Sequence, residues 1–274
     1  MIILNEDCFE AIRRQPDNSI DLVITSPPYA DIVNYGKTIS VKKSKDYVDW
    51  ILPLFKEIER VLKPSGSFIL NINDKCDGGV RNTYIYDLIS RNNNETKLKL
   101  YDTYIWHKKS GIPNGGAKRF RNTTEFIFHF CKKPKDMKFY MDRVLEEPKA
   151  ATEDGVRIKR KIRYSRGWTS EGQQDHIYEV REMPEKVRPD NVFRFSTAGA
   201  SRENTIKHPA PYHKELPLYF INLLTDRGDV VLDPFSGIGT TGVACLELDR
   251  EFIGYELNKT YSDFSIKRLN KPSN

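Results

Sequence analysis

The sequence Asp-Pro-Phe-Ser-Gly-Ile-Gly-Thr-Thr-Gly occupies residues 233–242, between a predicted strand at 230–233 and a predicted helix at 240–248. Its glycines fit the pattern G-x-G-x-x-G, which lets a strand-to-helix turn approach a nucleoside closely. Glu256 follows the next predicted strand, about 20 residues after Gly237, where a carboxylate accepts hydrogen bonds from ribose hydroxyls. The stretch therefore predicts a parallel α/β sheet with a nucleoside site at its carboxyl edge.

Two residues of this stretch favour S-adenosylmethionine over a dinucleotide. Asp233, at the end of the strand, suits a cationic amino group, which a pyrophosphate lacks. Phe235 fills space where a pyrophosphate-binding turn needs bare backbone. The order of the chain agrees, because a dinucleotide fold starts with this motif, whereas few residues of the sequence follow Glu256. We therefore expect the other strands earlier in the chain; an NAD oxidoreductase is the alternative.

A second motif, Thr-Ser-Pro-Pro-Tyr at residues 25–29, follows a predicted buried strand at 19–25. The two prolines fix two φ angles and remove two backbone donors, so the chain stays stiff and extended at the end of the strand. The carbonyls of Ser26 and Pro27 then point outward as acceptors, and the Tyr29 ring offers a flat face beside them. Such a tip suits a planar base that carries an amino group, whereas the other interpretation is a Pro-Pro turn with a packed tyrosine.

The remaining segments supply more strands and helices. Apolar runs predict strands at 2–4, 67–72, 100–107, 125–131 and 251–255. Helical periodicity predicts helices at 8–14, 47–62, 84–89, 214–225 and 258–269. Residues 63–66 predict a turn, and Pro53 predicts a kink or a later start in its helix. Because strands and helices alternate, we expect one parallel sheet with both motifs side by side on its carboxyl edge.

Basic residues gather in two segments, and the net charge is +6. Residues 108–122 form a Gly-rich loop with several cations and no acid, and residues 157–166 form a cationic run beside Trp168. Each segment is either a solvated surface or a set of phosphate contacts to nucleic acid. The residues predicted to contact DNA are Lys108, Lys109, Lys118, Arg119, Arg121, Lys159, Arg160, Lys161 and Arg163.

Over nearly its whole length the sequence resembles the β class of amino-methylating DNA methyltransferases, in which the catalytic motif precedes target recognition and the cofactor motif comes last. Residues 26–29 match its [S/D/N]PP[Y/F/W] motif and residues 235–239 its FxGxG motif, and the segments at 106–109 and 208–209 resemble its W-x-K and H-P segments. The resemblance implies a Rossmann-like S-adenosylmethionine-dependent methyltransferase fold, circularly reordered. It also implies a catalytic and cofactor-binding domain at 1–136 and 191–274, with a target-recognition region inserted at 137–190.

The resemblance assigns roles to individual residues. Asp7 would bind the adenine amino group of the cofactor, although a helix N-cap is its commoner role. Asp233 would lie by the methionine amine and Glu256 would bind the ribose. The other predicted cofactor contacts are Phe235, Gly237, Gly239, Thr240 and Thr241. The predicted catalytic residues are Ser26, Pro27, Pro28 and Tyr29, with the tyrosine stacked on the target base.

Family members with Ser before Pro-Pro typically methylate N4 of cytosine, whereas those with Asp or Asn typically methylate N6 of adenine. Ser26 therefore implies a site-specific enzyme that methylates cytosine N4 in double-stranded DNA after base flipping. N6-adenine methylation is the alternative, followed by RNA or protein-glutamine methylation. We further expect a restriction–modification role beside a separate cognate endonuclease, a monomer or homodimer, and a cytoplasmic, nucleoid-associated protein of a prokaryote.

The cysteines and the hydropathy pattern agree with that setting. Cys8, Cys76, Cys131 and Cys245 are widely spaced, and we expect them to be reduced and buried in an intracellular protein. The histidines show no metal-ligand spacing, so we expect no metal. We also expect neither a signal peptide nor a membrane span.

Overall fold

The computed structural model describes residues 1–30, 43–77, 79–108, 118, 120–147, 152–153, 156–157, 185–195 and 213–270. The chain divides into two compact units, Met1–Tyr140 with Asp190–Asn274, and Met141–Pro189. Within its described residues the second unit holds η2 (Met141–Val144), the hairpin of β8 (Thr152–Glu153) and β9 (Val156–Arg157), and an antiparallel bridge between Glu146 and Val187. Target recognition by residues 137–190 stays a prediction.

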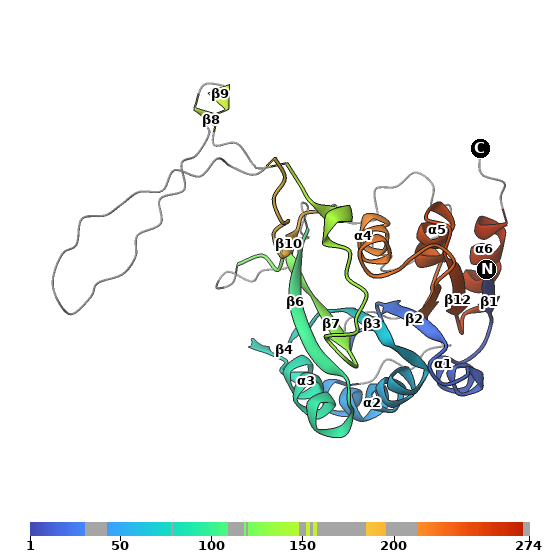
Figure 1. The fold of residues 1–274 in the computed structure, drawn as a ribbon. Helices are drawn as coiled ribbons and strands as arrows, with labels where there is room; N and C mark the ends of the chain where they lie inside the picture. The colour runs from blue at the N-terminus through green and yellow to red at the C-terminus, as the bar shows by residue number, and fades with distance from the viewer. Residues whose placement is uncertain are drawn as a thin grey trace. The chain divides into compact units, whose positions relative to one another are not determined.

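The first unit is built on an eight-stranded sheet in the order β1-β12-β11-β2-β3-β7-β6-β10 (Figure 1). Its strands are β1 (Ile2–Leu4), β2 (Ile20–Thr25), β3 (Leu62–Ile72), β6 (Lys99–His107), β7 (Thr124–Cys131), β10 (Val192–Phe193), β11 (Val230–Asp233) and β12 (Glu251–Tyr255). A separate small hairpin pairs β4 (Cys76–Asp77) with β5 (Val80–Arg81). Neither β10 nor this hairpin was predicted.

The sheet is mixed, so the prediction of one parallel sheet is wrong. Strand β7 runs antiparallel to both β3 and β6, while the other neighbouring pairs are parallel. The sequence between the two strands contains Gly111, Pro113, Gly115 and Gly116, which disfavour the crossover helix that parallel neighbours usually need, so an antiparallel pair is favoured. The pairing of β2 with β11 joins the early and late halves of the chain, as the reordered fold requires.

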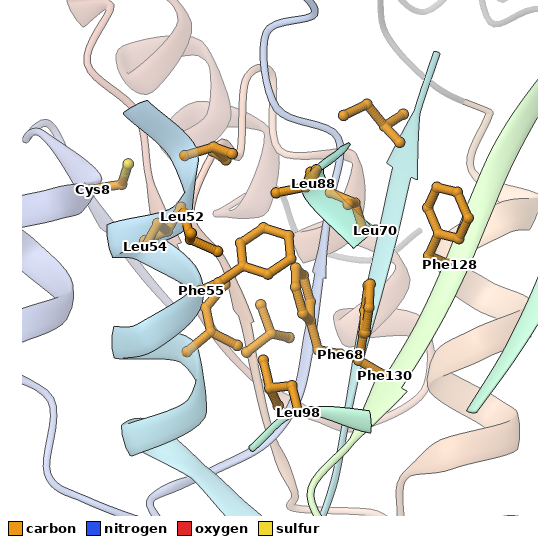
Figure 2. Packing of buried hydrophobic residues seen from close by; sticks show 14 of the residues in the cluster. Cys8, Leu52, Leu54, Phe55, Phe68, Leu70, Leu88, Leu98, Phe128 and Phe130 are labelled. Atoms are coloured by element: carbon orange, nitrogen blue, oxygen red, sulfur yellow. The ribbon is translucent and has the colours of Figure 1, made fainter. Parts of the chain in front are cut away.

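Helices cover both faces of the sheet. Figure 1 shows α1, α2 and α3 on one side and α4, α5 and α6 on the other. Their bounds are α1 (Cys8–Ala11, continued by η1, Ile12–Arg14), α2 (Ser44–Val61), α3 (Tyr84–Glu95), α4 (Glu215–Leu224), α5 (Thr240–Glu247) and α6 (Lys259–Leu269). Figure 2 shows Phe55 of α2 packed toward Phe68 and Phe130. The centroid of the Phe55 ring is 5.1 Å from that of Phe68 and 5.9 Å from that of Phe130. This apolar layer fixes β3 and β7 beneath α2.

Helix α2 begins at Ser44 and continues through Pro53, so a later start is ruled out. A proline inside a helix removes one hydrogen bond at a cost of about 3 kcal/mol. The buried stripe along α2 outweighs that cost, since burying one large apolar side chain contributes about 1.5–3 kcal/mol. The stripe consists of Tyr47, Val48, Ile51, Leu52, Phe55 and Ile58.

Two predicted boundaries differ for local reasons. Helix α3 continues to Glu95 because the Asn92 side chain is buried and donates to the carbonyl of Leu98 over 3.1 Å, with Thr96 Oγ1 donating to Asn92 Oδ1. Residues 63–66 belong to β3 instead of forming a turn. The register with β2 shifts between Ile20 and Leu22, so the extra residues form an irregularity within the strand pair.

All four cysteines are free; Cys8, Cys131 and Cys245 are buried as expected, whereas Cys76 is only partly buried. Burial raises the pKa of the Cys8 and Cys245 thiols, which keeps them protonated at neutral pH. Within the described ranges, no helix combines the length and the apolar character needed to cross a bilayer.

Candidate active site

The two sequence motifs lie beside each other at the carboxyl edge of the sheet. Strands β2 and β11 are parallel neighbours, so Ser26 follows one strand where Asp233 ends the next. The contact is direct, because Thr25 Oγ1 donates to Asp233 Oδ1 over 2.6 Å. The expected placement of the motifs is therefore confirmed.

Asp233 fixes the start of the glycine-rich loop by hydrogen bonds. Its side chain is completely buried, and Thr241 Oγ1 donates to Oδ2 over 2.5 Å while the Phe235 amide donates to Oδ1 over 3.1 Å. The Phe235 ring lies 6.0 Å from the ring of Trp50 on α2. Asp233 thus links the loop to α5 and, through Thr25, to β2. Its predicted contact with the methionine amine stays a prediction.

The glycines of the loop are needed for two different reasons. Gly237 and Gly239 have φ of +51° and +78°, a backbone conformation that other residues adopt only with strain. Gly242 is needed for packing, because a Cβ there would lie 2.9 Å from atoms of Phe252 and Leu269. Thr240 and Thr241 begin α5 directly after the turn. Gly242 therefore allows α5 to pack closely against β12.

Glu256 closes the loop against the end of β12. Its Oε2 accepts from the Gly237 amide over 2.9 Å and its Oε1 from the Asn258 amide over 2.7 Å. Burial raises the pKa of this carboxyl, while the two amide donors oppose the rise. Because each carboxylate oxygen has two lone pairs, acceptor capacity is left for ribose hydroxyls.

Asp7 is the N-cap of α1, since its Oδ1 accepts from the Phe9 amide over 2.9 Å. It follows β1, the neighbour of β12, so it lies on the same edge as Glu256. Its predicted contact with adenine is untested.

Two features of this edge fit S-adenosylmethionine. The turn at Gly237 and Gly239 has positive φ angles, and Glu256 is a buried carboxylate with acceptor capacity left for ribose hydroxyls.

In the Ser-Pro-Pro-Tyr motif, the tyrosine is buried and its hydroxyl is hydrogen-bonded inside the protein. Pro27, Pro28 and Tyr29 are buried, and Ser26 is partly exposed. The Tyr29 hydroxyl lies 3.0 Å from Ser26 Oγ and donates to Glu125 Oε2 over 2.8 Å, with Asn71 Oδ1 at 3.2 Å. Only 9% of Tyr29 is exposed, so little of its ring is accessible here. Stacking on the target base therefore stays a prediction.

Glu125 and Asn71 were missed by the sequence analysis. Glu125 is the second residue of β7, is 7% exposed and accepts from Asn71 Nδ2 over 3.1 Å. Its other oxygen pairs with Lys108, whose ammonium lies 5.5 Å from the centre of the Trp106 ring. The signal in the sequence was a charged residue at the head of an otherwise apolar strand. Lys108, predicted to contact DNA, is thus engaged by a carboxylate inside the protein.

The other predicted DNA contacts divide into two groups. Lys118 and Arg121 are described and exposed, as a phosphate contact requires. The remaining predicted DNA contacts and the segment 208–209 lie outside the described residues. These contacts are Lys109, Arg119, Lys159, Arg160, Lys161 and Arg163. Within the part of the chain that the structure describes, no cluster of His, Cys, Asp and Glu could hold a metal ion.

Comparison with known proteins shows which family this chain belongs to. The model of the N6/N4 DNA methylases matches residues 20–267, so the chain belongs to this DNA methylase family. It is 28% identical to the type II methyltransferase M.HpaI of Haemophilus parainfluenzae, over 99% of this chain and 75% of that protein. It is 27% identical to the DNA adenine methyltransferase YhdJ of Escherichia coli strain K12, over 99% and 83%.

Solved structures show the same fold. The cytosine-N4-specific PvuII DNA methyltransferase matches 99% of this chain and 87% of its own, with a TM-score of 0.74 and 23% identity. The M1.HpyAVI–SAM complex matches 98% of this chain and 99% of its own, with a TM-score of 0.58 and 24% identity. The predicted family, the Rossmann-like methyltransferase fold and S-adenosylmethionine as cofactor are confirmed.

Proposed function

We propose that this DNA methyltransferase methylates the exocyclic N4 of cytosine at a specific site in duplex DNA, after the base has flipped out of the helix. The observation that carries the proposal is Ser26, a partly exposed hydroxyl at the end of β2, next to the cofactor loop through the Thr25–Asp233 hydrogen bond of 2.6 Å. Serine in this position is the family's usual mark of cytosine-N4 enzymes. PvuII methyltransferase, which shares the fold, is described as cytosine-N4-specific.

The reaction needs acceptors around the amine. An exocyclic amine is a poor nucleophile because its lone pair is delocalised into the ring, and it must rehybridise toward sp³ to react. The Ser26 hydroxyl and the Pro27 carbonyl would accept from its two N–H bonds and stabilise the positive charge that develops on nitrogen. The bound cofactor supplies the methyl group, on a sulfonium. Glu256 and the turn at 237–239 would hold the cofactor in line with the amine.

Base flipping makes the amine accessible. In a duplex the amino group is paired, so the base must leave the stack at a cost of about a few kcal/mol. The Tyr29 ring would lie beside the extruded base, and residues 137–190 would read the sequence around it. A cognate restriction endonuclease acting separately, a monomeric or homodimeric state and a cytoplasmic location complete the proposal.

Adenine N6 is the second candidate, because YhdJ, similar over 99% of this chain, is described as an adenine methyltransferase. RNA and protein-glutamine methylation lose support from the match to a DNA methylase family. The test is digestion of DNA methylated by the purified enzyme, followed by mass identification of the nucleosides. N4-methylcytosine is expected, and N6-methyladenine as the sole product would overturn the cytosine assignment.

Ser26→Ala tests the site itself. It leaves the Pro-Pro backbone and the Tyr29 ring in place, so DNA and cofactor binding should persist while turnover is lost, as for an interaction made in the transition state. Tyr29→Ala should in addition lower base extrusion, measured with a fluorescent base at the target position, since base–aromatic stacking contributes about 1–3 kcal/mol. Full methylation by either variant would mean that the tip is a structural turn.

A further inference from the structure

A chain of hydrogen bonds leads from the proposed catalytic hydroxyl to a buried carboxylate. Ser26 Oγ lies 3.0 Å from the Tyr29 hydroxyl, which donates to Glu125 Oε2 over 2.8 Å. Glu125 is therefore two hydrogen bonds away from Ser26, although it lies on β7, far along the chain. The reaction as proposed above makes no use of this carboxylate.

Glu125 determines the direction in which protons are donated along these hydrogen bonds. An ionised carboxylate only accepts hydrogen bonds, and this one already accepts from Asn71 Nδ2 and from Lys108. The single Tyr29 proton is therefore donated inward to Glu125 Oε2, which at 2.8 Å is nearer than Asn71 Oδ1 at 3.2 Å. The Tyr29 oxygen then accepts the Ser26 proton. With its only proton turned inward, Ser26 faces the substrate side with lone pairs alone.

We propose that Glu125 is a positioning residue that fixes Ser26 as a hydrogen-bond acceptor toward the target amine, and that Lys108 serves this carboxylate and not a DNA phosphate. The inference rests on the proposed role of Ser26. An acceptor is what the reaction needs there, because the amine presents N–H bonds and gains positive charge. Lys108 lies over the Trp106 ring at 5.5 Å, which holds its ammonium beside Glu125.

Glu125→Gln is the decisive variant because it keeps the shape of the side chain. Its amide can donate to the Tyr29 oxygen, so that Tyr29 donates to Ser26 and the Ser26 proton turns toward the amine. We expect kcat to fall by about ten- to a hundredfold, the size of one charge-assisted hydrogen bond, with KM for DNA and cofactor affinity unchanged. Lys133→Gln, which changes an exposed lysine two residues after the end of β7, is the matched control and should leave kcat unchanged.

Tyr29→Phe supplies the second measurement, since it breaks the chain but keeps the ring. It should lower kcat by a similar factor, and Glu125→Gln should add little in its background, because both changes interrupt the same chain. Lys108→Gln should lower kcat while the salt dependence of DNA binding stays that of the native enzyme. A decrease of about one unit in the salt slope would instead make Lys108 a phosphate contact and overturn that part.

The results separate this inference from the proposed function. Wild-type kcat in Glu125→Gln, or effects of Glu125→Gln and Tyr29→Phe that simply add, would overturn the positioning role while an inactive Ser26→Ala still supports the site. Full turnover in Ser26→Ala would instead overturn the proposed active site at Ser26. If Glu125→Gln does not fold, wild-type kcat in Tyr29→Phe overturns the inference on its own.

Discussion

Asp233 and Glu256 are buried carboxylates on the same edge of the sheet, but their surroundings give them different tasks. Both oxygens of Asp233 accept from threonine hydroxyls, Thr25 on one side and Thr241 on the other. Each oxygen of Glu256 accepts from one backbone amide, which leaves lone pairs for a ligand. Asp233 is thus suited to building the site and Glu256 to binding the cofactor.

Alanine variants should separate these tasks. Glu256→Ala should weaken S-adenosylmethionine binding about ten- to a hundredfold, the size of one charge-assisted hydrogen bond, while the fold persists. Asp233→Ala should weaken binding and also lower the free energy of unfolding by about 1–3 kcal/mol, because it leaves two buried hydroxyls without their acceptor. Calorimetric titration and urea unfolding measure the two quantities. Unchanged cofactor affinity in both variants would remove both residues from the site.

At the scale of elements, β7 is where the structure adds most to the sequence. Its position at 124–131 was predictable from its apolar run, as was β12 at 251–255, which is bounded by Arg250 and Glu256. Its direction and its neighbours were not, because they depend on pairing between residues far apart in the chain. Glu125 was missed for that reason: its partners are Tyr29 after β2, Asn71 on β3 and Lys108 just after β6. The two-residue β10 was too short to carry a pattern.

Strand β7 also predicts how stability depends on pH. His129 is fully buried in its middle, with Nε2 2.9 Å from Ser67 Oγ, and burial lowers the pKa of His129 to about 3. An unfolded histidine has a pKa of about 6.5, so between these values the unfolded state binds the extra proton and stability falls as pH falls. The decrease is about 1.4 kcal/mol per pH unit, or about 2 kcal/mol at pH 5.

The measurement compares native protein with His129→Gln, by urea unfolding at pH 7.5 and pH 5.0. The variant lacks the titrating ring, so its free energy of unfolding should fall less over this interval, by about 2 kcal/mol. Carboxyl groups that titrate in the same range are common to both proteins and cancel in the difference. Equal decreases in the two proteins would mean that His129 can take up a proton without unfolding.

At the scale of the molecule, the basic run is the prediction that reaches beyond the described residues. Neutralising Lys159, Arg160 and Lys161 should weaken DNA binding and flatten its salt dependence by roughly one unit of slope for each phosphate that the protein no longer neutralises. Cofactor affinity should not change, because the cofactor residues lie in a different unit of the chain. Binding assays across a salt series measure both effects. Native DNA affinity at low salt would make the run a solvated surface.

The hydrogen bond between Thr25 and Asp233 joins residues 208 positions apart, and it has a consequence for the birth of the protein. At about 5–20 residues per second, a ribosome needs about 10 to 40 s to make the intervening chain. During that interval β2, buried along its whole length in the finished fold, waits for the strand that covers one of its edges. Uncovered strand edges invite pairing with other chains. A nascent chain that stops before β11 therefore exposes an unpaired edge of β2, which can pair with other chains, and lacks the glycine-rich cofactor loop.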